Sequence, residues 1–321
     1  MALRSTDTHG SPHAGPPRPD ETLGSLPTEA GGEPGADYDL RATDDLVSSM
    51  LRTDEAVLPA VAAATAAIAA TIDAVSGRLG QGGRLIYVGA GSSGRLAALD
   101  AAECESTFSA TPGQVVALVA GGIASPPLEQ EAAEDDSAAG AADIGALGVG
   151  PDDAVVGISA SGRTPYVVGA LEAASARGAL TAALVSVEGS GLGRVAAHEI
   201  AVVVGPEFIA GSTRLKAGTA QKLVLNMIST ISMIRLGKTF GNLMVDVAAT
   251  NEKLHSRVRR IVETATGASP EQVDQALEES GGNAKVAIVS LLAGVDAETA
   301  RARLAAAGDN TRLALDGQPG S

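Results

Sequence analysis

Five short apolar runs, separated mostly by segments of helix-forming composition, constrain the fold of this chain more than any other feature. Strands that alternate with helices are typical of βαβ units, and such units build a parallel sheet. The sequence therefore predicts an α/β fold with a five-stranded parallel sheet and helices on both faces, in a doubly wound sandwich. The predicted strands are residues 85–88, 115–119, 154–158, 180–185 and 200–204.

The composition fits this architecture. Hydrophobic residues make up 45% of the 321 residues, but aromatic residues only 2%, and tryptophan is absent. The core must therefore consist of Ala, Val, Leu and Ile, which suits helices packed closely on a parallel sheet. The length is enough for one large or two modest domains.

Two of the predicted strands end in turns rich in serine and glycine. Residues 89–95 read Gly-Ala-Gly-Ser-Ser-Gly-Arg and residues 159–164 read Ser-Ala-Ser-Gly-Arg-Thr, each before a predicted helix. A strand, such a turn and a helix N-terminus present backbone N–H groups to an anion, and ligands of parallel sheets bind at the carboxyl ends of strands. We expect one phosphate-sized pocket, with the candidate binding residues Gly91, Ser92, Ser93, Gly94, Ser159, Ser161, Arg163 and Thr164.

A third polar turn, residues 211–219, follows the fifth predicted strand and supplies two further candidate binding residues, Ser212 and Lys216. A mere tight strand–helix connection is the alternative for any one of these turns. The recurrence of the pattern at several strand ends favours a binding site.

Several kinds of site and partner are not expected. The first turn lacks the Gly-Lys-Ser/Thr of a Walker A loop, and Arg95 replaces the third glycine of the dinucleotide fingerprint. One cysteine and four scattered histidines give no metal-ligand spacing. The net charge of −15 argues against a nucleic acid or an anionic membrane as partner. We therefore expect neither a cofactor nor a metal.

The single Cys104 excludes an internal disulfide framework and fits a reducing compartment. No apolar stretch resembles a signal peptide or reaches membrane-spanning length. The predicted location is the cytoplasm.

Composition changes along the chain divide it into four parts. Residues 1–40 are rich in Pro, Gly, Ser and Thr and are predicted to be a mostly disordered extension. Residues 41–264 hold the sheet. In this part a helical pattern begins at residues 44–50, and residues 54–79 are predicted to form a long Ala-rich helix. Residues 265–312 are predicted to form three short helices, the first opened by a capping box at Ser269 to Gln272, and residues 313–321 are a tail.

Several longer stretches together resemble the N-acetylmuramic acid 6-phosphate etherases, a family with the sugar-isomerase (SIS) fold. They are residues 85–95, 99–104, 160–167, 211–225 and 240–255 apart from 247–248. The resemblance implies that residues 41–264 are an SIS phosphosugar-binding catalytic domain. It also implies that residues 265–312 are a ubiquitin-associated-like helical domain. The chain departs from the family at Thr28-Glu29, which lacks the usual following Asn, and at Glu105-Ser106, where Pro-Pro is common.

The resemblance implies syn elimination of D-lactate from carbon 3 of a 6-phosphosugar, followed by addition of water to give N-acetylglucosamine 6-phosphate. This chemistry needs a base for the carbon-2 proton and an acid for the leaving ether oxygen. By motif position, the resemblance implies Glu103 and Glu134 as this pair. The apolar neighbours of Glu103 favour its burial, so we assign it as the acid, and Glu134, in an acidic run, as the base. On the residues alone, both could be solvated surface groups.

The roles of nearby polar residues stay open. Lys216 and Lys222 could each contact the lactyl carboxylate or the phosphate, or be surface lysines. Asp100 could tie its helix to a neighbouring element.

The spacing of Ser93 and Glu103 bears on the assembly. Ten residues of continuous helix span about 15 Å, more than a hexose phosphate. Either the helix breaks early or a second subunit completes the pocket. SIS proteins commonly dimerise with sites near the interface, so we expect a homodimer.

Two other functions are alternatives to the etherase hypothesis. A non-catalytic phosphosugar-binding regulator, related to the glucokinase regulatory proteins, would share the fold and several motifs. A phosphosugar isomerase would need a ring-opening group, and no histidine lies in the Ser/Gly turns. The presence of both Glu103 and Glu134 in a chain with one SIS-like unit favours the etherase.

Overall fold

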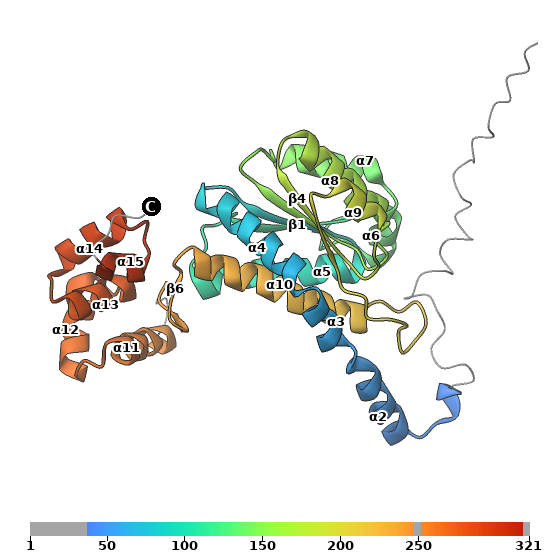
Figure 1. Ribbon diagram of the computed structural model, residues 1–321. Coiled ribbons are helices and arrows are strands. Elements are labelled where there is room, and N and C mark those ends of the chain that lie inside the picture. The colour runs from blue at the N-terminus through green and yellow to red at the C-terminus, as the bar shows by residue number, and fades with distance from the viewer. Residues whose placement is uncertain (1–36, 247–251, 317–321) are drawn as a thin grey trace, which may run out of the picture.

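The computed structural model describes residues 37–246 and 252–316 (Figure 1). The predicted N-terminal extension lies outside these residues, apart from 37–40, which include the short helix η1 (Tyr38–Leu40). Thr28-Glu29 and the last residues of the predicted tail also lie outside them.

The central sheet is the predicted one. Its strands run in the order β2-β1-β3-β4-β5, and every neighbouring pair is parallel. Helices cover both faces, so the predicted α/β fold class is confirmed (Figure 1). The strand bounds are β1 (Leu85–Gly89), β2 (Val115–Val119), β3 (Ala154–Ile158), β4 (Leu180–Val185) and β5 (His198–Ala201).

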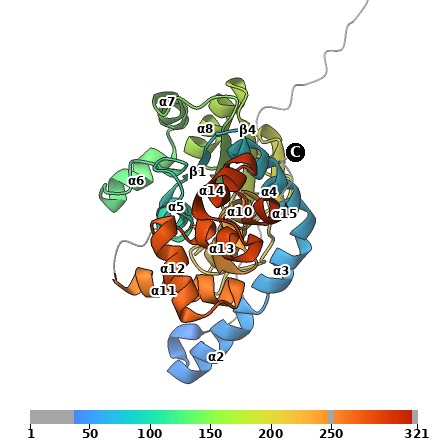
Figure 2. The same cartoon turned by 90° about the vertical axis from the view of Figure 1, so that its left-hand side faces the viewer.

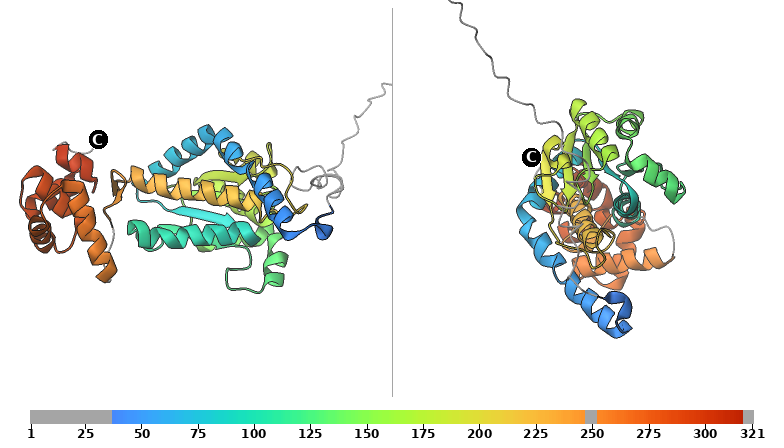
Figure 3. Two further views of the ribbon diagram at one scale, coloured as in Figure 1. Left: turned by 90° about the horizontal axis from the view of Figure 1, so that it is seen from below. Right: turned by 90° about the vertical axis from the view of Figure 1, so that its right-hand side faces the viewer.

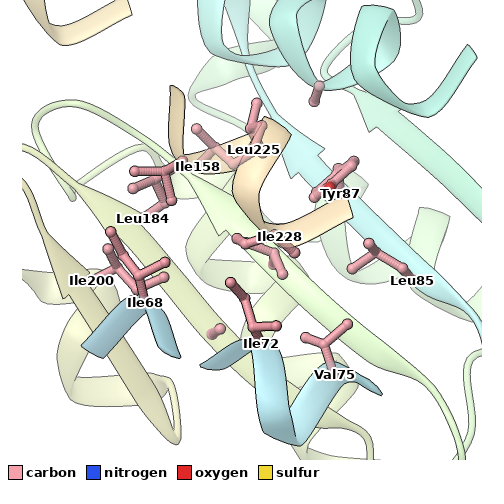
Figure 4. Packing of buried hydrophobic residues seen from close by; sticks show 14 of the residues in the cluster. Ile68, Ile72, Val75, Leu85, Tyr87, Ile158, Leu184, Ile200, Leu225 and Ile228 are labelled. Atoms are coloured by element: carbon pink, nitrogen blue, oxygen red, sulfur yellow. The ribbon is translucent and has the colours of Figure 1, made fainter. Parts of the chain in front are cut away.

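Burial on both faces explains why the strands read as continuous apolar runs rather than alternating ones. Leu85 and Tyr87 of β1 face one layer, formed mainly by α4 (Thr65–Gly80), α5 (Gly91–Phe108) and α10 (Lys216–Arg235). Figure 4 shows this layer, in which Ile72 and Ile228 approach the sheet. Ile86 and Val88 face the opposite layer, whose helices are α7 (Ser137–Ala146), α8 (Pro165–Ala176) and α9 (Gly191–Val195).

The fifth strand differs from its predicted bounds of 200–204. It pairs only along residues 182–185 of β4 and ends at Ala201. Val202 still donates its N–H to the Val185 carbonyl at 2.8 Å, and both Val202 and Val204 are buried after the strand has ended. The apolar residues after Ala201 therefore indicate that this segment is buried, and they do not show that the strand continues.

The predicted helix over residues 54–79 is wrong in its continuity, because the segment is divided among α2 (Thr43–Asp54), α3 (Val57–Ala63) and α4. Pro59 has no N–H for the Glu55 carbonyl, so one helix cannot run unchanged from α2 through α3. No single helix among the described residues is long and apolar enough to cross a membrane. The segments 43–63 and 65–80 pass that test only as a pair, bent by 58°, on length and composition.

A hairpin of β6 (Thr239–Phe240) and β7 (Leu243–Met244) follows α10 and leads to the C-terminal helices. These helices lie beyond the end of α10 in Figure 1 and face the viewer in Figure 2. The capping box is confirmed, since Ser269 Oγ accepts from the Gln272 N–H and Gln272 Oε1 accepts from the Ser269 N–H. The helices are α11 (Glu252–Thr266), α12 (Pro270–Ser280), α13 (Ala284–Ala293), α14 (Ala297–Ala306) and α15 (Thr311–Asp316).

Helix α11 packs with this C-terminal group. Its Val258 and Val262 share a buried cluster with Val273 of α12 and Ile288 of α13. We therefore propose that the C-terminal unit begins before α11, earlier than the predicted boundary after residue 264.

A buried lysine ties the C-terminal helices to the hairpin. Lys285 of α13 is only 1% exposed, and its ammonium lies 2.8 Å from the Asp246 carboxylate and 2.6 Å from the Asp309 carboxylate. It also donates to the Asp309 carbonyl at 2.9 Å. Lys238 contacts the same Asp246 carboxylate at 2.8 Å. We call these four residues the Lys285 cluster.

Candidate active site

The first Ser/Gly turn joins β1 to α5 at the carboxyl end of the strand. Gly94 lies so close to Gly89 that a Cβ at position 94 would stand 2.8 Å from the Gly89 carbonyl oxygen. Only glycine allows this approach, which sets the start of α5 directly above the strand. The first backbone N–H groups of α5, those of Gly91 to Ser93, therefore face the edge of the sheet without intrahelical partners.

The second turn, after β3, is held by its own hydrogen bonds. Ser159 Oγ lies 2.8 Å from Thr164 Oγ1 and accepts the Gly162 N–H at 3.1 Å. Gly162 has φ of 64°, and a Cβ there would lie 2.4 Å from Ser190 Cβ. The turn is thus fixed by Ser159 from within, while Ser161 is partly exposed above it.

The two turns meet in one pocket of about 270 Å³, because β1 and β3 are neighbouring strands. This volume is near the lower end of the range for small-molecule sites. Hydroxyl groups, backbone and one carboxylate supply the polar atoms. The pocket is lined by Ala90, Gly91, Ser92, Ser93, Glu134, Ile158, Ser159, Ala160, Ser161, Thr164 and Thr213.

Glu134 supplies that carboxylate. It is the last residue of α6 (Pro127–Glu134) and is half-buried. Thr164 Oγ1 donates to Glu134 Oε1 at 3.1 Å, so the second turn directs this side chain. The carboxylate is therefore positioned beside the Ser/Gly turns and can accept a proton from a bound ligand.

Glu103 does not line this pocket. Helix α5 is continuous from residue 91 to 108, which places Glu103 about 15 Å from Ser93 along the axis. The predicted burial of Glu103 is wrong in the single chain, because its side chain is 58% exposed. Ala101 and Cys104 face the core, whereas Glu103 points from the outer side of the helix, where Lys222 Nζ lies 3.4 Å away.

A buried polar cluster lies next to Glu103, towards the sheet. Asp100 is 3% exposed, accepts the Tyr87 hydroxyl at 3.0 Å and lies 3.8 Å from Lys222 Nζ. Burial raises the pKa of Asp100, opposed by hydrogen bonds from Ser229 and Tyr87. Burial, with the Asp100 charge adding to it, raises the pKa of the Cys104 thiol to about 12. Asp100 therefore ties α5 to β1, which is the role considered for it from the sequence.

Lys216 is a correction to the predicted set of binding residues. Its side chain is 4% exposed, and its ammonium donates to the Val204 carbonyl at 2.8 Å. The Lys216 N–H donates to the Glu207 carboxylate at 3.0 Å. Lys216 thus anchors the start of α10 and is neither a pocket group nor a surface lysine.

Three other predicted binding residues lie outside the pocket lining. Gly94 is buried behind the lining, and Arg163 is exposed to solvent. Ser212 does not line the pocket, but its neighbour Thr213 does. Thr213 belongs to the same polar turn, so the pattern indicated the segment but not the residue. Gln221 was missed entirely, although Ser93 Oγ donates to its Oε1 at 2.9 Å, because 128 residues separate the two.

The described residues hold no group of three or more His, Cys, Asp or Glu side chains arranged to bind a metal ion.

Family models place the chain in a class. A model of the glucokinase regulatory protein N-terminal SIS domain matches residues 67–175, and a model of the SIS domain matches residues 137–231. Together with the parallel sheet and the pocket at its carboxyl edge, these matches define an SIS-domain protein.

Whole-chain comparisons identify the family. An N-acetylmuramic acid 6-phosphate etherase of Rubrobacter xylanophilus is 58% identical over 89% of this chain and 95% of its own length. Etherases of Streptomyces coelicolor and Vibrio cholerae are 54% and 47% identical, covering 91% and 92% of this chain and 94% and 96% of their own lengths. This chain belongs to the N-acetylmuramic acid 6-phosphate etherase family, and the resemblance seen in the sequence is confirmed. The relatives support this assignment and not the regulator considered as an alternative.

Proposed function

We propose that this protein is a carbon–oxygen lyase that removes the D-lactyl ether from N-acetylmuramic acid 6-phosphate. The products are N-acetylglucosamine 6-phosphate and D-lactate, formed by elimination and then hydration. The observation that carries the proposal is the 58% identity to an etherase over nearly the whole chain, joined to a pocket in which a carboxylate lies beside two Ser/Gly turns.

The 6-phosphate is assigned to the Ser/Gly turns. Their donors are neutral hydroxyl and backbone N–H groups at the start of a long helix, an arrangement that suits a phosphate. Since the chain as a whole carries a charge of −15, such local donors are needed to hold an anionic ligand.

Glu134 is proposed as the base. Its Oε1 already accepts from Thr164, so the side chain is oriented before the ligand arrives. In the reaction it would take the carbon-2 proton or activate the water that adds afterwards.

Glu103 is proposed as the acid, delivered by a second copy of the chain. The continuous helix α5 keeps it about 15 Å from Ser93 of its own chain. Leu99, one helical turn before Glu103 on α5, is an exposed apolar side chain, and α10, which packs against α5, exposes Ile231 and Ile234. Such a surface supports a contact between subunits, so we propose a homodimer with sites shared between chains. We also propose a cytoplasmic location, which the single free Cys104 fits.

The function is tested by proton NMR of N-acetylmuramic acid 6-phosphate with the purified protein in heavy water. The wild-type protein should release D-lactate and form N-acetylglucosamine 6-phosphate. Glu103→Gln should slow lactate release by about 10²–10⁴-fold and still allow slow exchange of the carbon-2 hydrogen. Glu134→Gln should impair that exchange or the hydration step.

Glu105→Gln is the matched control, because Glu105 is exposed on the same helix two residues further along. It should leave the rate unchanged. Lactate release at the wild-type rate by Glu103→Gln would remove Glu103 from the mechanism, and no release by the wild-type protein would refute the function.

A further inference from the structure

A buried glutamine contacts the pocket from behind. Gln221 of α10 is 3% exposed, and its Oε1 accepts the hydroxyl of Ser93, which lines the pocket, at 2.9 Å. Figure 3 shows α10 and α5 lying alongside each other. Gln221 does not line the pocket itself but contacts Ser93, which does.

The amide nitrogen of Gln221 has no partner in the described part of the chain. Buried N–H donors are rarely left unpaired, whereas a carbonyl oxygen short of one hydrogen bond is more common. The two ends of a side-chain amide are nearly identical in shape, so a half-turn about the last bond exchanges them without moving the backbone.

The direction of the Ser93 hydrogen bond decides what the pocket offers. While Ser93 donates to Gln221 Oε1, its only hydrogen points away from the pocket, and only lone pairs remain for a ligand. An anion needs a donor at this place. With the amide turned, Nε2 donates to Ser93 Oγ, and the Ser93 O–H is released towards the pocket.

We propose that Gln221 is a positioning residue for phosphate binding. In the ligand-bound protein its Nε2 donates to Ser93 Oγ, and Ser93 donates in turn to a phosphate oxygen. This inference rests on the proposed function in placing a phosphate at the Ser/Gly turns. The arrangement adds a donor without adding a charge, and it pairs the orphaned nitrogen.

Inorganic phosphate is the probe, with binding to the full-length protein measured by titration calorimetry. Gln221→Glu keeps the shape. Because burial raises the pKa of a carboxyl group, the titration is done at a pH high enough to ionise it, and the carboxylate can then only accept from Ser93, so the hydroxyl stays turned away. We expect the Kd for phosphate to rise about tenfold or more, as for loss of a hydrogen bond to a charged group. Gln221→Met removes both amide functions without adding charge and should raise the Kd severalfold. Gln81→Glu, exposed at the end of α4, adds the same charge elsewhere and should leave the Kd within about twofold.

A second pair of variants separates positioning from a merely structural role. In a Ser93→Ala background, Gln221→Met should cause no further loss of phosphate binding, because its partner is already absent. In turnover of the phosphosugar, Gln221→Met should raise KM far more than it lowers kcat.

Unchanged phosphate affinity in a folded Gln221→Met protein would overturn the proposal. So would an equal loss with and without Ser93, or the absence of phosphate binding by the wild-type protein. The phosphate titration does not depend on ether cleavage. A protein that binds phosphate as described but releases no lactate would refute the proposed function and leave the role of Gln221 standing.

Discussion

The hydroxyl groups of the pocket are not equivalent, because their hydrogen bonds differ. Ser159 is 3% exposed and holds the second turn together through Thr164 and the Gly162 N–H. Within residues 37–246 and 252–316, the hydrogen bonds of Ser161 are longer, at 3.3 Å, to Ser159 and from the Arg163 N–H. Ser161 can therefore turn to a ligand at little cost, whereas Ser159 is committed to the fold.

Replacing these two serines should separate binding from stability. Ser161→Ala should weaken binding of N-acetylglucosamine 6-phosphate by about 0.5–3 kcal/mol and leave the Tm unchanged. Ser159→Ala should lower the Tm, because it removes the buried hydroxyl that bonds Thr164 Oγ1 and the Gly162 N–H. Calorimetric titration and thermal unfolding measure the two effects, and equal affinity of Ser161→Ala and wild type would exclude Ser161 from the site.

At this scale the sequence predicts which segments meet more reliably than which side chains turn inwards. The Ser/Gly turns were predicted from local pattern and lie together. The burial of Glu103 was inferred from its neighbours, but adjacent residues of a helix point about 100° apart, so Cys104 is buried and Glu103 is exposed. Lys216 was misplaced because its acceptors, Val204 and Glu207, lie in a preceding loop with no periodic pattern.

At the scale of elements, the strands were predictable because burial on both faces leaves an unbroken apolar run. The same signal extended the prediction past the end of β5 at Ala201, because Val202 and Val204 are buried beyond the register that β5 shares with β4. Between elements, an ion pair joins the loops that precede β1 and β3. Arg84 lies 2.7 Å from the carboxylate of Asp153, which also accepts the Gly150 N–H.

Because of this ion pair, the free energy of unfolding should depend on pH in the acidic range. Burial alone would raise the pKa of Asp153, but the hydrogen bonds from Arg84 and Gly150 outweigh it, and the pKa is lowered. A lowered folded-state pKa stabilises the fold above the unfolded value of about 3.9, and this contribution is lost as the pH falls through the folded-state pKa.

Asp153→Asn should therefore lower the free energy of unfolding at pH 7 by about 1–3 kcal/mol. The difference from wild type should shrink below about pH 4. Urea unfolding across this pH range measures it, with Asp152→Asn, an exposed neighbour, as the control. A difference that stays constant with pH would show that the carboxylate charge contributes nothing.

At the scale of the whole molecule, the two proposed catalytic carboxylates lie in different surroundings. Glu134 lines the pocket, while Glu103 stands on an open helix face beside Leu99. The hydrogen bonds of Ser93 with Gln221 and of Lys285 with Asp309 join residues that are separated in the sequence. Such long-range contacts leave no local pattern, so the sequence alone does not predict them.

Mixing two inactive variants tests whether the sites are shared. In a hybrid of Glu103→Gln with Glu134→Gln chains, one site would combine Glu134 of the first chain with Glu103 of the second and be intact. Random exchange should restore about a quarter of wild-type lactate release, since half of the dimers are hybrids with one good site each. Failure to recover activity, with exchange verified by mass spectrometry of the intact dimers, would favour a site within one chain.

The Lys285 cluster makes the folding of the C-terminal helices depend on the segment that follows α14, because Asp309 lies there. A premature stop or a proteolytic cut after α14 would remove Asp309, and with it two of the three acceptors around an ammonium sealed from water. Keeping the Lys285 ammonium buried without these partners is costly, so the shortened C-terminal helices would unfold. A chain shortened at this end would therefore expose the apolar faces of its remaining C-terminal helices to proteolysis.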